Sequence, residues 1–230
     1  MIEGFSLLTH ATLRINDSKT NQIIYIDPFK IDKPQEDEKT EIILITHSHF
    51  DHFHLESIAK LYKKGCTVIV TRGCEEITNI VAKEDIKIVN PDEDFIVKGI
   101  RVSTIASYNN KPESLKFHPK QNEFVGYILT ANNKMIYHAG DTDNIPEMKT
   151  LANKIDFAFL PIGGTYTMDV NEAAKATQII MPKIVVPMHC IPLGSIENQK
   201  KAQSEFKKLV ENQTNGKVNV ELLGGIGSFD

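Results

Sequence analysis

Tryptophan is absent from the 230 residues, and cysteine occurs only three times, at Cys66, Cys74 and Cys190, with no Cys-x-x-Cys pair. An odd number of cysteines without paired spacing argues against a disulfide framework and favours a reducing cytoplasm. The sequence also lacks a run that approaches the roughly 18–20 apolar residues needed to cross a bilayer. Its N-terminus does not have the pattern of a signal peptide. We therefore expect a cytoplasmic protein without membrane insertion.

An excess of charge of either sign is missing as well. The chain has 26 basic and 30 acidic side chains, which give a formal net charge of -4. A sequence with such balanced charge has no excess of basic residues that would bind nucleic acid, and no nucleic-acid partner is expected. No linker rich in Gly, Ser or Pro divides the chain, so residues 1–230 are expected to form a single domain. The sequence leaves open whether the chain forms a homo-oligomer.

Short β-rich runs alternate with helical patterns along the chain. The apolar runs at 41–46, 66–71, 155–161 and 183–189 are typical of buried strands. Helical patterns occupy 55–62, 75–83, 170–181 and 195–212, and 218–223 is expected to be a last strand. Two packed sheets with helices outside would bury all these runs. A doubly wound α/β fold would also do so, and periodicity alone does not separate the two.

The segment Thr46-His47-Ser48-His49-Phe50-Asp51-His52 directly follows a buried strand. Its three imidazoles and one carboxylate are ligands that zinc, manganese and iron accept. His47 and His49 are two residues apart, so on an extended chain they point to the same side. Asp51 and His52 follow where the chain turns into a helix, and they are expected to point at a second position nearby. A purely structural role is hard to defend, because these groups would repel one another on protonation.

Two further strands also end in ligand-type residues. One runs into Gly140-Asp141-Thr142, and the other ends in Pro187-Met188-His189. By itself, Asp141 would be an ordinary turn residue and His189 an ordinary polar group. Because each follows a β-run, as the first motif does, the strand ends can converge on one edge of a sheet.

The ordered set T-H-S-H-F-D-H, H-A-G-D-T and P-M-H resembles the metallo-β-lactamase superfamily over nearly the whole chain. The opening His10-Ala11, the run Ile26-Asp27-Pro28-Phe29 and the run from Leu160 to Asp169 are similar to a narrower subgroup. That subgroup contains ascorbate phosphate lactonase-like and N-acyl-phosphatidylethanolamine phospholipase D-like hydrolases. The resemblance implies an α/β fold, a four-layer αβ/βα sandwich of two mostly antiparallel or mixed sheets flanked by helices. It also implies metals at one edge of the sandwich.

The resemblance assigns roles by position. His47 and His49 would hold one metal, Asp51, His52 and His189 a second metal, and Asp141 would bridge both. Two divalent ions per chain are implied, with zinc expected first and manganese, nickel or iron as alternatives. His10 and Asp27 would orient ligand histidines through their other ring nitrogens.

The chain departs from the family pattern at one ligand. Family members supply a further histidine for the first metal, but the equivalent stretch here, Ala106-Ser107-Tyr108-Asn109, has none. His118, in a long polar loop over 107–123, is the preferred substitute, and His138 is the alternative. Asn109 and His138 are also candidates for supporting a ligand or the substrate.

The implied activity is hydrolysis of a small ester, lactone or phosphodiester substrate. A metal-bridged hydroxide would be the nucleophile, Asp51 would orient it and take up a proton, and Asp141 would hold the metals. Tyr166, close to Gly163-Gly164, is a candidate donor to the substrate. Two alternatives remain: a nuclease acting on nucleic-acid phosphodiesters, and a metal-binding sensor without turnover.

Overall fold

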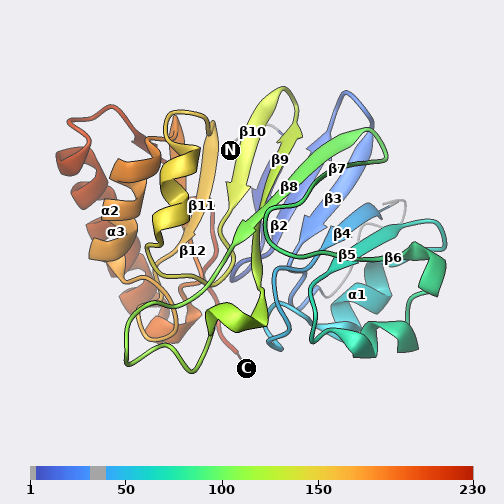
Figure 1. Ribbon diagram of the computed structural model, residues 1–230. Helices are drawn as coiled ribbons and strands as arrows, with labels where there is room; N and C mark the ends of the chain where they lie inside the picture. The colour runs from blue at the N-terminus through green and yellow to red at the C-terminus, as the bar shows by residue number, and fades with distance from the viewer. Residues whose placement is uncertain (1–3, 32–39, 230) are drawn as a thin grey trace.

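The computed structural model describes residues 4–31 and 40–229, and it consists of two sheets with helices on their outer faces (Figure 1). The first sheet has the strand order β1 (Phe5–Leu7), β2 (Leu13–Asp17), β3 (Gln22–Ile26), β4 (Thr40–Leu44), β5 (Thr67–Val70) and β6 (Ile86–Ile88). The second has the order β13 (Asn219–Val220), β12 (Ile184–Met188), β11 (Phe157–Pro161), β10 (Lys134–His138), β9 (Val125–Ala131), β8 (Ile100–Ala106) and β7 (Asp94–Val97). Both sheets are mixed, with antiparallel hairpins on one side and parallel pairs on the other.

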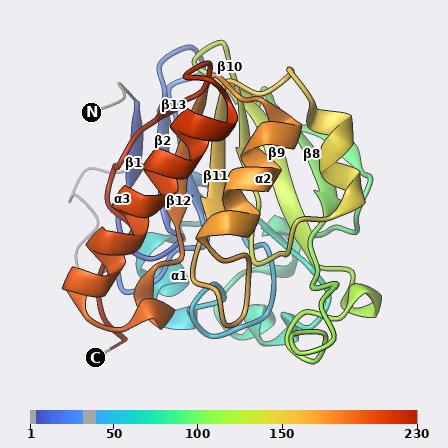
Figure 2. The same cartoon turned by 90° about the vertical axis from the view of Figure 1, so that its left-hand side faces the viewer.

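Helices form the two outer layers. Helix α1 (Leu55–Leu61) lies against the first sheet, whereas α2 (Val170–Ile180) and α3 (Ile196–Gln213) lie against the second sheet (Figure 2). The capping box expected from Asp169 and Glu172 is present at the start of α2. The layers therefore run helix, sheet, sheet, helix, which confirms the predicted four-layer sandwich. No helix in the described part of the chain is both long and apolar enough to cross a membrane.

Shorter elements differ from the sequence-based expectation in two places. The predicted helix at 75–83 is two 3-10 turns, η1 (Glu75–Asn79) and η2 (Lys83–Asp85). The predicted last strand at 218–223 pairs only over Asn219–Val220, because the chain then leaves the sheet. The remaining 3-10 turns are η3 (Lys120–Asn122), η4 (Pro146–Leu151) and η5 (Ile191–Leu193).

Strand β4 shows why the apolar runs are continuous. Ile42 and Leu44 pack in the interior between the two sheets, while Ile43 and Ile45 pack in the separate core beneath α1. All four side chains are fully buried. A strand covered on both faces has no position left for a polar residue, so its sequence shows no alternation.

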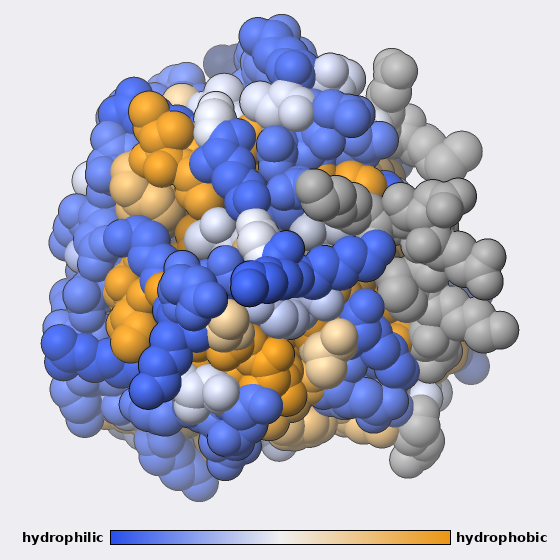
Figure 3. Space-filling view, turned by 90° about the vertical axis from the view of Figure 1, so that its right-hand side faces the viewer, coloured by the Kyte–Doolittle hydropathy of each residue, from blue (hydrophilic) through white to orange (hydrophobic). Residues whose placement is uncertain are grey.

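On the side of the molecule that carries α1 and β6, hydrophobic patches are interrupted by hydrophilic residues (Figure 3).

The parallel strands place their carboxyl ends at one edge of the sandwich, at the bottom of Figure 1. Strand β3 leads into Asp27 and β4 leads into the motif 46–52. Strand β10 leads into Asp141, and β12 leads into His189. The topology therefore gathers residues that are far apart in sequence, as expected for the carboxyl edge of parallel strands.

Candidate metal centre

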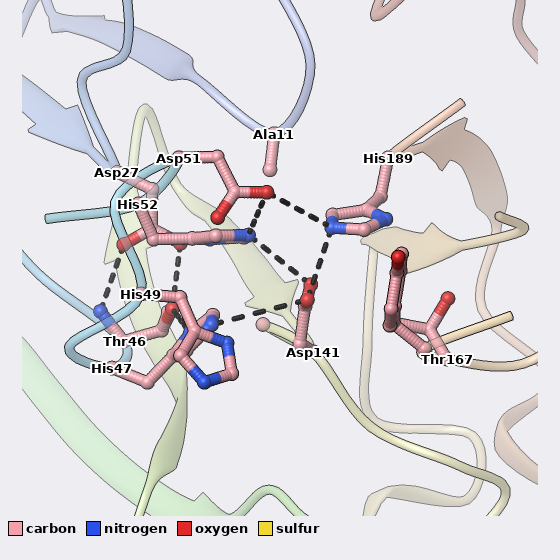
Figure 4. A network of polar contacts seen from close by, with 12 residues as sticks. Ala11, Asp27, Thr46, His47, His49, Asp51, His52, Asp141, Thr167 and His189 are labelled. Carbon is pink, nitrogen blue, oxygen red and sulfur yellow. Dashed lines mark hydrogen bonds and ion pairs between the residues drawn. The ribbon is translucent and has the colours of Figure 1, made fainter. Parts of the chain in front are cut away.

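Two groups of ligand-type side chains lie at this edge, and in each group the candidate ligand atoms are all within 4.8 Å of one another. The first group, called cluster one here, consists of His47, His49, His118 and Asp141. The second group, cluster two, consists of His10, Asp51, His52 and His189. Figure 4 shows most of these side chains pointing toward one another from both sheets. The structure thus brings together every residue that the sequence assigned to a metal.

Asp141 lies between the two clusters. Its Oδ2 is 3.4 Å from Nε2 of His118 in cluster one and 3.0 Å from Nε2 of His189 in cluster two. Its other oxygen, Oδ1, is 3.3 Å from Nε2 of His52. One buried carboxylate therefore faces imidazoles of both clusters, which is the position that a bridging ligand requires.

Asp27 and Thr46 orient two of the histidines. Nδ1 of His52 donates to Oδ2 of Asp27 at 2.7 Å, which leaves Nε2 of His52 facing the cluster. The hydroxyl of Thr46 donates to the same oxygen at 2.7 Å and lies 2.9 Å from Nδ1 of His47. Sequence reasoning anticipated the position of Asp27 but not the part played by Thr46, although Thr46 stands directly beside His47 in the motif.

The loop over 107–123 brings His118 into cluster one. Its Nδ1 is 2.8 Å from Oδ1 of Asn109, and its Nε2 lies 3.1 Å from Nδ1 of His49. The backbone N–H of Asn109 donates to the carbonyl of His118 at 2.8 Å, so the two ends of the loop are paired. Asn109 therefore holds the ring of His118 with one nitrogen directed at cluster one.

A second anchor ties this loop to the turn that carries Asp141. Oδ2 of Asp143 accepts hydrogen bonds from the backbone N–H of Asn110 at 2.9 Å and from the hydroxyl of Ser114 at 3.2 Å. Its Oδ1 is 3.2 Å from Nζ of Lys111. His118 and Asp141 are consequently fixed relative to each other through buried polar contacts.

His138, the alternative to His118, lies outside both clusters. It is fully buried, and its Nε2 donates to the carbonyl of Ala11 at 2.8 Å. Its Nδ1 accepts a weak hydrogen bond from the backbone N–H of Gly140 at 3.3 Å. These contacts join strand β10 of the second sheet to the loop after β1 of the first sheet.

His10 lies closer to the candidate ligands than a remote support would. Its Nε2 donates to Oδ2 of Asp51 at 3.0 Å, and its ring centroid is 4.0 Å from that of His189. The backbone N–H of His189 also donates to the carbonyl of His10 at 3.0 Å. His10 thus positions two members of cluster two at once.

Three residues at this edge have a strained backbone conformation. His10, Asp27 and His189 all have left-handed backbone conformations, with φ of 48°, 47° and 57°. Such conformations in residues with side chains cost on the order of 1 kcal/mol or more each and collect at functional sites. Gly163 relieves crowding next to His189, since a Cβ on Gly163 would lie 2.6 Å from the His189 carbonyl oxygen.

Several buried polar atoms at this edge have no hydrogen-bond partner among the described residues. They include Nε2 of His47, His52 and His189, and Oδ1 of Asp141, and Nδ1 of His10 and Nδ1 of His189 lack a partner as well. A buried polar atom without a partner normally costs about 1–3 kcal/mol. The close contacts among the first four of these atoms lack hydrogen-bond geometry, yet they are lone-pair donors aimed at a common space. Imidazole nitrogen and carboxylate oxygen are also the donor set of divalent transition metals, so the residues fit metal ions.

The close packing of these imidazoles and carboxylates shifts their pKa values in the metal-free protein. Burial lowers the pKa of His189, but the carboxylates of Asp141 and Asp51 outweigh burial and raise it to about 9. Burial raises the pKa of Asp141, but His189 and His52 outweigh burial and hold it well below its usual range. Burial lowers the pKa of His47 well below its usual range. Without metal, protons on His189 compensate the charge of Asp141, and bound cations would replace them.

A cavity of about 390 Å³ opens onto both clusters. Its lining includes His49, Asp51, His118, Asp141 and His189 from the clusters. Tyr166, the candidate substrate donor, also lines this cavity, and its ring packs edge-on against Phe117 at 4.7 Å. Sequence reasoning missed the aromatic part of the lining, which is Phe50, Phe117 and Phe229.

Comparison with known proteins agrees with this geometry. The model of the beta-lactamase superfamily domain matches residues 5–189. A metal-dependent hydrolase of Pyrococcus abyssi is 34% identical over 219 residues, which are 88% of this chain and 90% of that protein. A metal-dependent hydrolase of Methanosarcina mazei is 29% identical over 227 residues, 94% of each chain.

A crystal structure from Parabacteroides distasonis, assigned as that of a metal-dependent hydrolase, has a TM-score of 0.78 and 28% identity. The similarity covers 95% of this chain and 91% of that one. The narrower likeness to lactonase-like and phospholipase D-like members remains a prediction. On the sequence match, the sandwich fold and the paired histidine-aspartate clusters together, the chain belongs to the beta-lactamase superfamily, within a family of metal-dependent hydrolases.

Proposed function

We propose that the protein hydrolyses a small ester, lactone or phosphodiester and that two divalent cations serve the reaction. The observation that carries this proposal is the position of Asp141, which faces histidines of both clusters, together with Nε2 of His47, His52 and His189, which have no hydrogen-bond partner among the described residues. Asp141 and His47, His49 and His118 would hold one cation. Asp141 and Asp51, His52 and His189 would hold the other. Zinc is the first expectation, with manganese, nickel and iron as alternatives, because the same ligand types serve all four.

When bound, the two cations lower the pKa of water and polarise the electrophilic centre of the substrate. Side chains that line the cavity would supply the proton transfers of the reaction. Asp51 lines the cavity, and its Oδ2 is held by Nε2 of His10, so the carboxylate is placed to accept the proton of the attacking water. Tyr166 also lines the cavity and would donate its hydroxyl hydrogen to a substrate oxygen.

We also propose that residues 1–230 act as one domain in the cytoplasm on a small molecule. All three cysteines are free and buried, which suits a reducing compartment. The ligands come from both sheets, so the two halves of the sandwich have to stay together for the site to exist.

The test is elemental analysis of the protein after saturation with zinc or manganese, followed by assay with generic chromogenic esters, lactones and phosphodiesters. We expect up to two metal equivalents per chain and turnover that a chelator abolishes. Binding of no more than one equivalent would refute the two-metal arrangement. Two bound metals without any turnover would instead favour a sensor.

A further inference from the structure

The wall of the cavity beyond the clusters is aromatic. Phe50 comes from the motif after β4, Phe117 and Tyr166 come from two loops of the second sheet, and Phe229 comes from the C-terminal segment. Four separate segments of the chain thus place aromatic rings around one opening. Residues that are distant in sequence and share only this location point to a common binding role.

Three of these rings are exposed although they are large. Phe50 is 64% exposed, Phe229 is 41% exposed and Tyr166 is 39% exposed. Phe50 and Phe229 lie 5.7 Å apart, and Phe29 supports both from below at 6.2 Å. Single exposed apolar residues are common, but a contiguous group beside a site marks a binding surface.

The C-terminal segment holds Phe229 at the opening through hydrogen bonds to α3. The side chain of Gln203 donates to the carbonyl of Gly224 at 2.8 Å. Gln199 donates to the carbonyl of Gly227 at 2.8 Å and accepts from its N–H at 3.0 Å. This segment lies beyond residues 5–189, which the superfamily model matches.

The lining contains no arginine or lysine among the described residues. Of the lysines on the loop that carries Phe117, Lys111 is paired with Asp143 at 3.2 Å and with Glu172 at 2.8 Å, and Lys116 lies over the Phe117 ring, 5.0 Å from its centroid. A phosphodiester carries a permanent negative charge that only the two proposed cations would meet here, whereas proteins that bind phosphate usually add arginine or lysine. An uncharged carbonyl compound needs no such partner, and an apolar chain attached to it would be buried by the aromatic wall.

We infer that the aromatic wall formed by Phe50, Phe117, Tyr166 and Phe229 is a subsite for an apolar acyl chain, so that the substrate is a carboxylic ester or lactone with such a chain. The inference rests on the proposed hydrolytic function. In the reaction, the oxygen of water forms a bond to the acyl carbon, the acyl C–O bond breaks, and the departing alkoxide oxygen takes up a proton. For a lactone, acid and alcohol remain in one molecule.

Two measurements on the metal-loaded full chain test this subsite. The first is kcat/KM for p-nitrophenyl acetate, butyrate and hexanoate and for bis(p-nitrophenyl) phosphate. The second is the Kd of acetohydroxamate and hexanohydroxamate by calorimetry, in which a common head group isolates the effect of the chain. Each added methylene should improve both quantities by about threefold to fourfold until the cavity is filled.

Phe50→Ala and Phe229→Ala should each reduce the ratio of hexanoyl to acetyl compounds in both measurements. Both side chains are partly exposed, so the fold should survive. Ile96→Ala is the matched control, because Ile96 is 74% exposed on the edge strand β7 and does not line the cavity.

Any of three results would overturn the inference. The hexanoyl-to-acetyl ratio could lie near one, or it could be unchanged by both phenylalanine variants. The third result is a higher kcat/KM for the phosphodiester than for the hexanoate ester. A different result would separate the two proposals. If no compound is turned over, but hydroxamates bind more tightly as their chain grows and both variants weaken that binding, the proposed hydrolysis is refuted and the subsite is supported. The two failures are therefore distinguishable.

Discussion

Cluster one and cluster two are held in place by different parts of the molecule. In cluster two, His52 rests on Asp27, which follows strand β3 and is fully buried. His189 follows strand β12 directly and is hydrogen bonded through its backbone to His10. In cluster one, His118 arrives on the long loop over 107–123 and rests on Asn109 of the same loop.

The supporting groups also differ in charge. Asp27 offers a carboxylate to the ring of His52, whereas Asn109 offers a neutral amide to the ring of His118. A hydrogen bond to an ionised acceptor is roughly twice as strong as a neutral one. Cluster two is therefore the more rigid and better supported of the two, and we expect it to bind a cation first and release it last.

Removing the link between the clusters should have the largest effect. Asp141→Asn takes away the only carboxylate among the described residues that faces histidines of both clusters, so both sites should lose affinity and turnover should vanish. Circular dichroism should show that the fold is retained, and elemental analysis gives the metal content. A variant that kept two equivalents and a near-normal rate would show that Asp141 does not bridge.

The next largest effect should be confined to cluster one. His118→Ala should remove about one metal equivalent and most activity, because the loop then brings no ligand to that cluster. His138→Ala should leave metal content unchanged and lower stability by about 1–3 kcal/mol, since the buried carbonyl of Ala11 loses its donor. Full metal loading of His118→Ala beside a depleted His138→Ala would reverse the assignment.

Removing the negative charge of Asp27, which supports His52 of cluster two, should reduce metal binding less than the previous changes and mainly at cluster two. Asp27→Asn keeps the shape but removes the charge opposite His52 and Thr46. We expect metal affinity or activity to fall by about 10–100-fold, as is typical when a partner of a ligand histidine is lost. Stepwise metal titration should place the larger loss in the tighter site and a smaller one in the other, because Asp27 also reaches His47 of cluster one through Thr46. Equal weakening of both sites would contradict the proposed ranking of the clusters.

The smallest loss of metal affinity should come from removing Asn109, the residue that supports His118 of cluster one. Asn109→Ala frees the ring of His118 but leaves the histidine in place, so the weaker site should lose about tenfold in affinity, the low end of such effects. Asn110→Ala is the control on the same loop, because the Asn110 side chain donates to the carbonyl of Asn144 and not to the ring of His118. An Asn109 effect larger than that of Asp27→Asn would reverse the proposed ranking of the clusters.

The ligand-type residues at the strand ends were predictable because their order and spacing are encoded locally. His47, His49, Asp51 and His52 stand within six positions, and Asp141 and His189 each follow an apolar run. His118 was harder, because its place depends on how a loop of irregular sequence folds. The contacts of Asn109 and Asp143 that fix this loop join residues with no recognisable spacing.

Other features could not be predicted because they depend on tertiary packing. The aromatic wall combines Phe50, Phe117 and Phe229, which no local pattern connects. The last strand is shorter than its apolar pattern suggests, because residues after Val220 leave the sheet and run back toward the cavity. Periodicity also left a doubly wound fold open, since its strands are equally covered on both faces.

The dispersal of the ligands along the chain has a consequence for biosynthesis. His10 is synthesised long before His189, which directly follows β12, and β12 can pair only after most of the second sheet has been made. Cluster two cannot be completed on a nascent chain that lacks β12, so an emerging polypeptide holds its histidines without the geometry that retains a cation. Metal capture at cluster two is thereby delayed until β12 has joined the second sheet, and a chain that fails to close is left without the stabilisation that metal bound there gives to the native state.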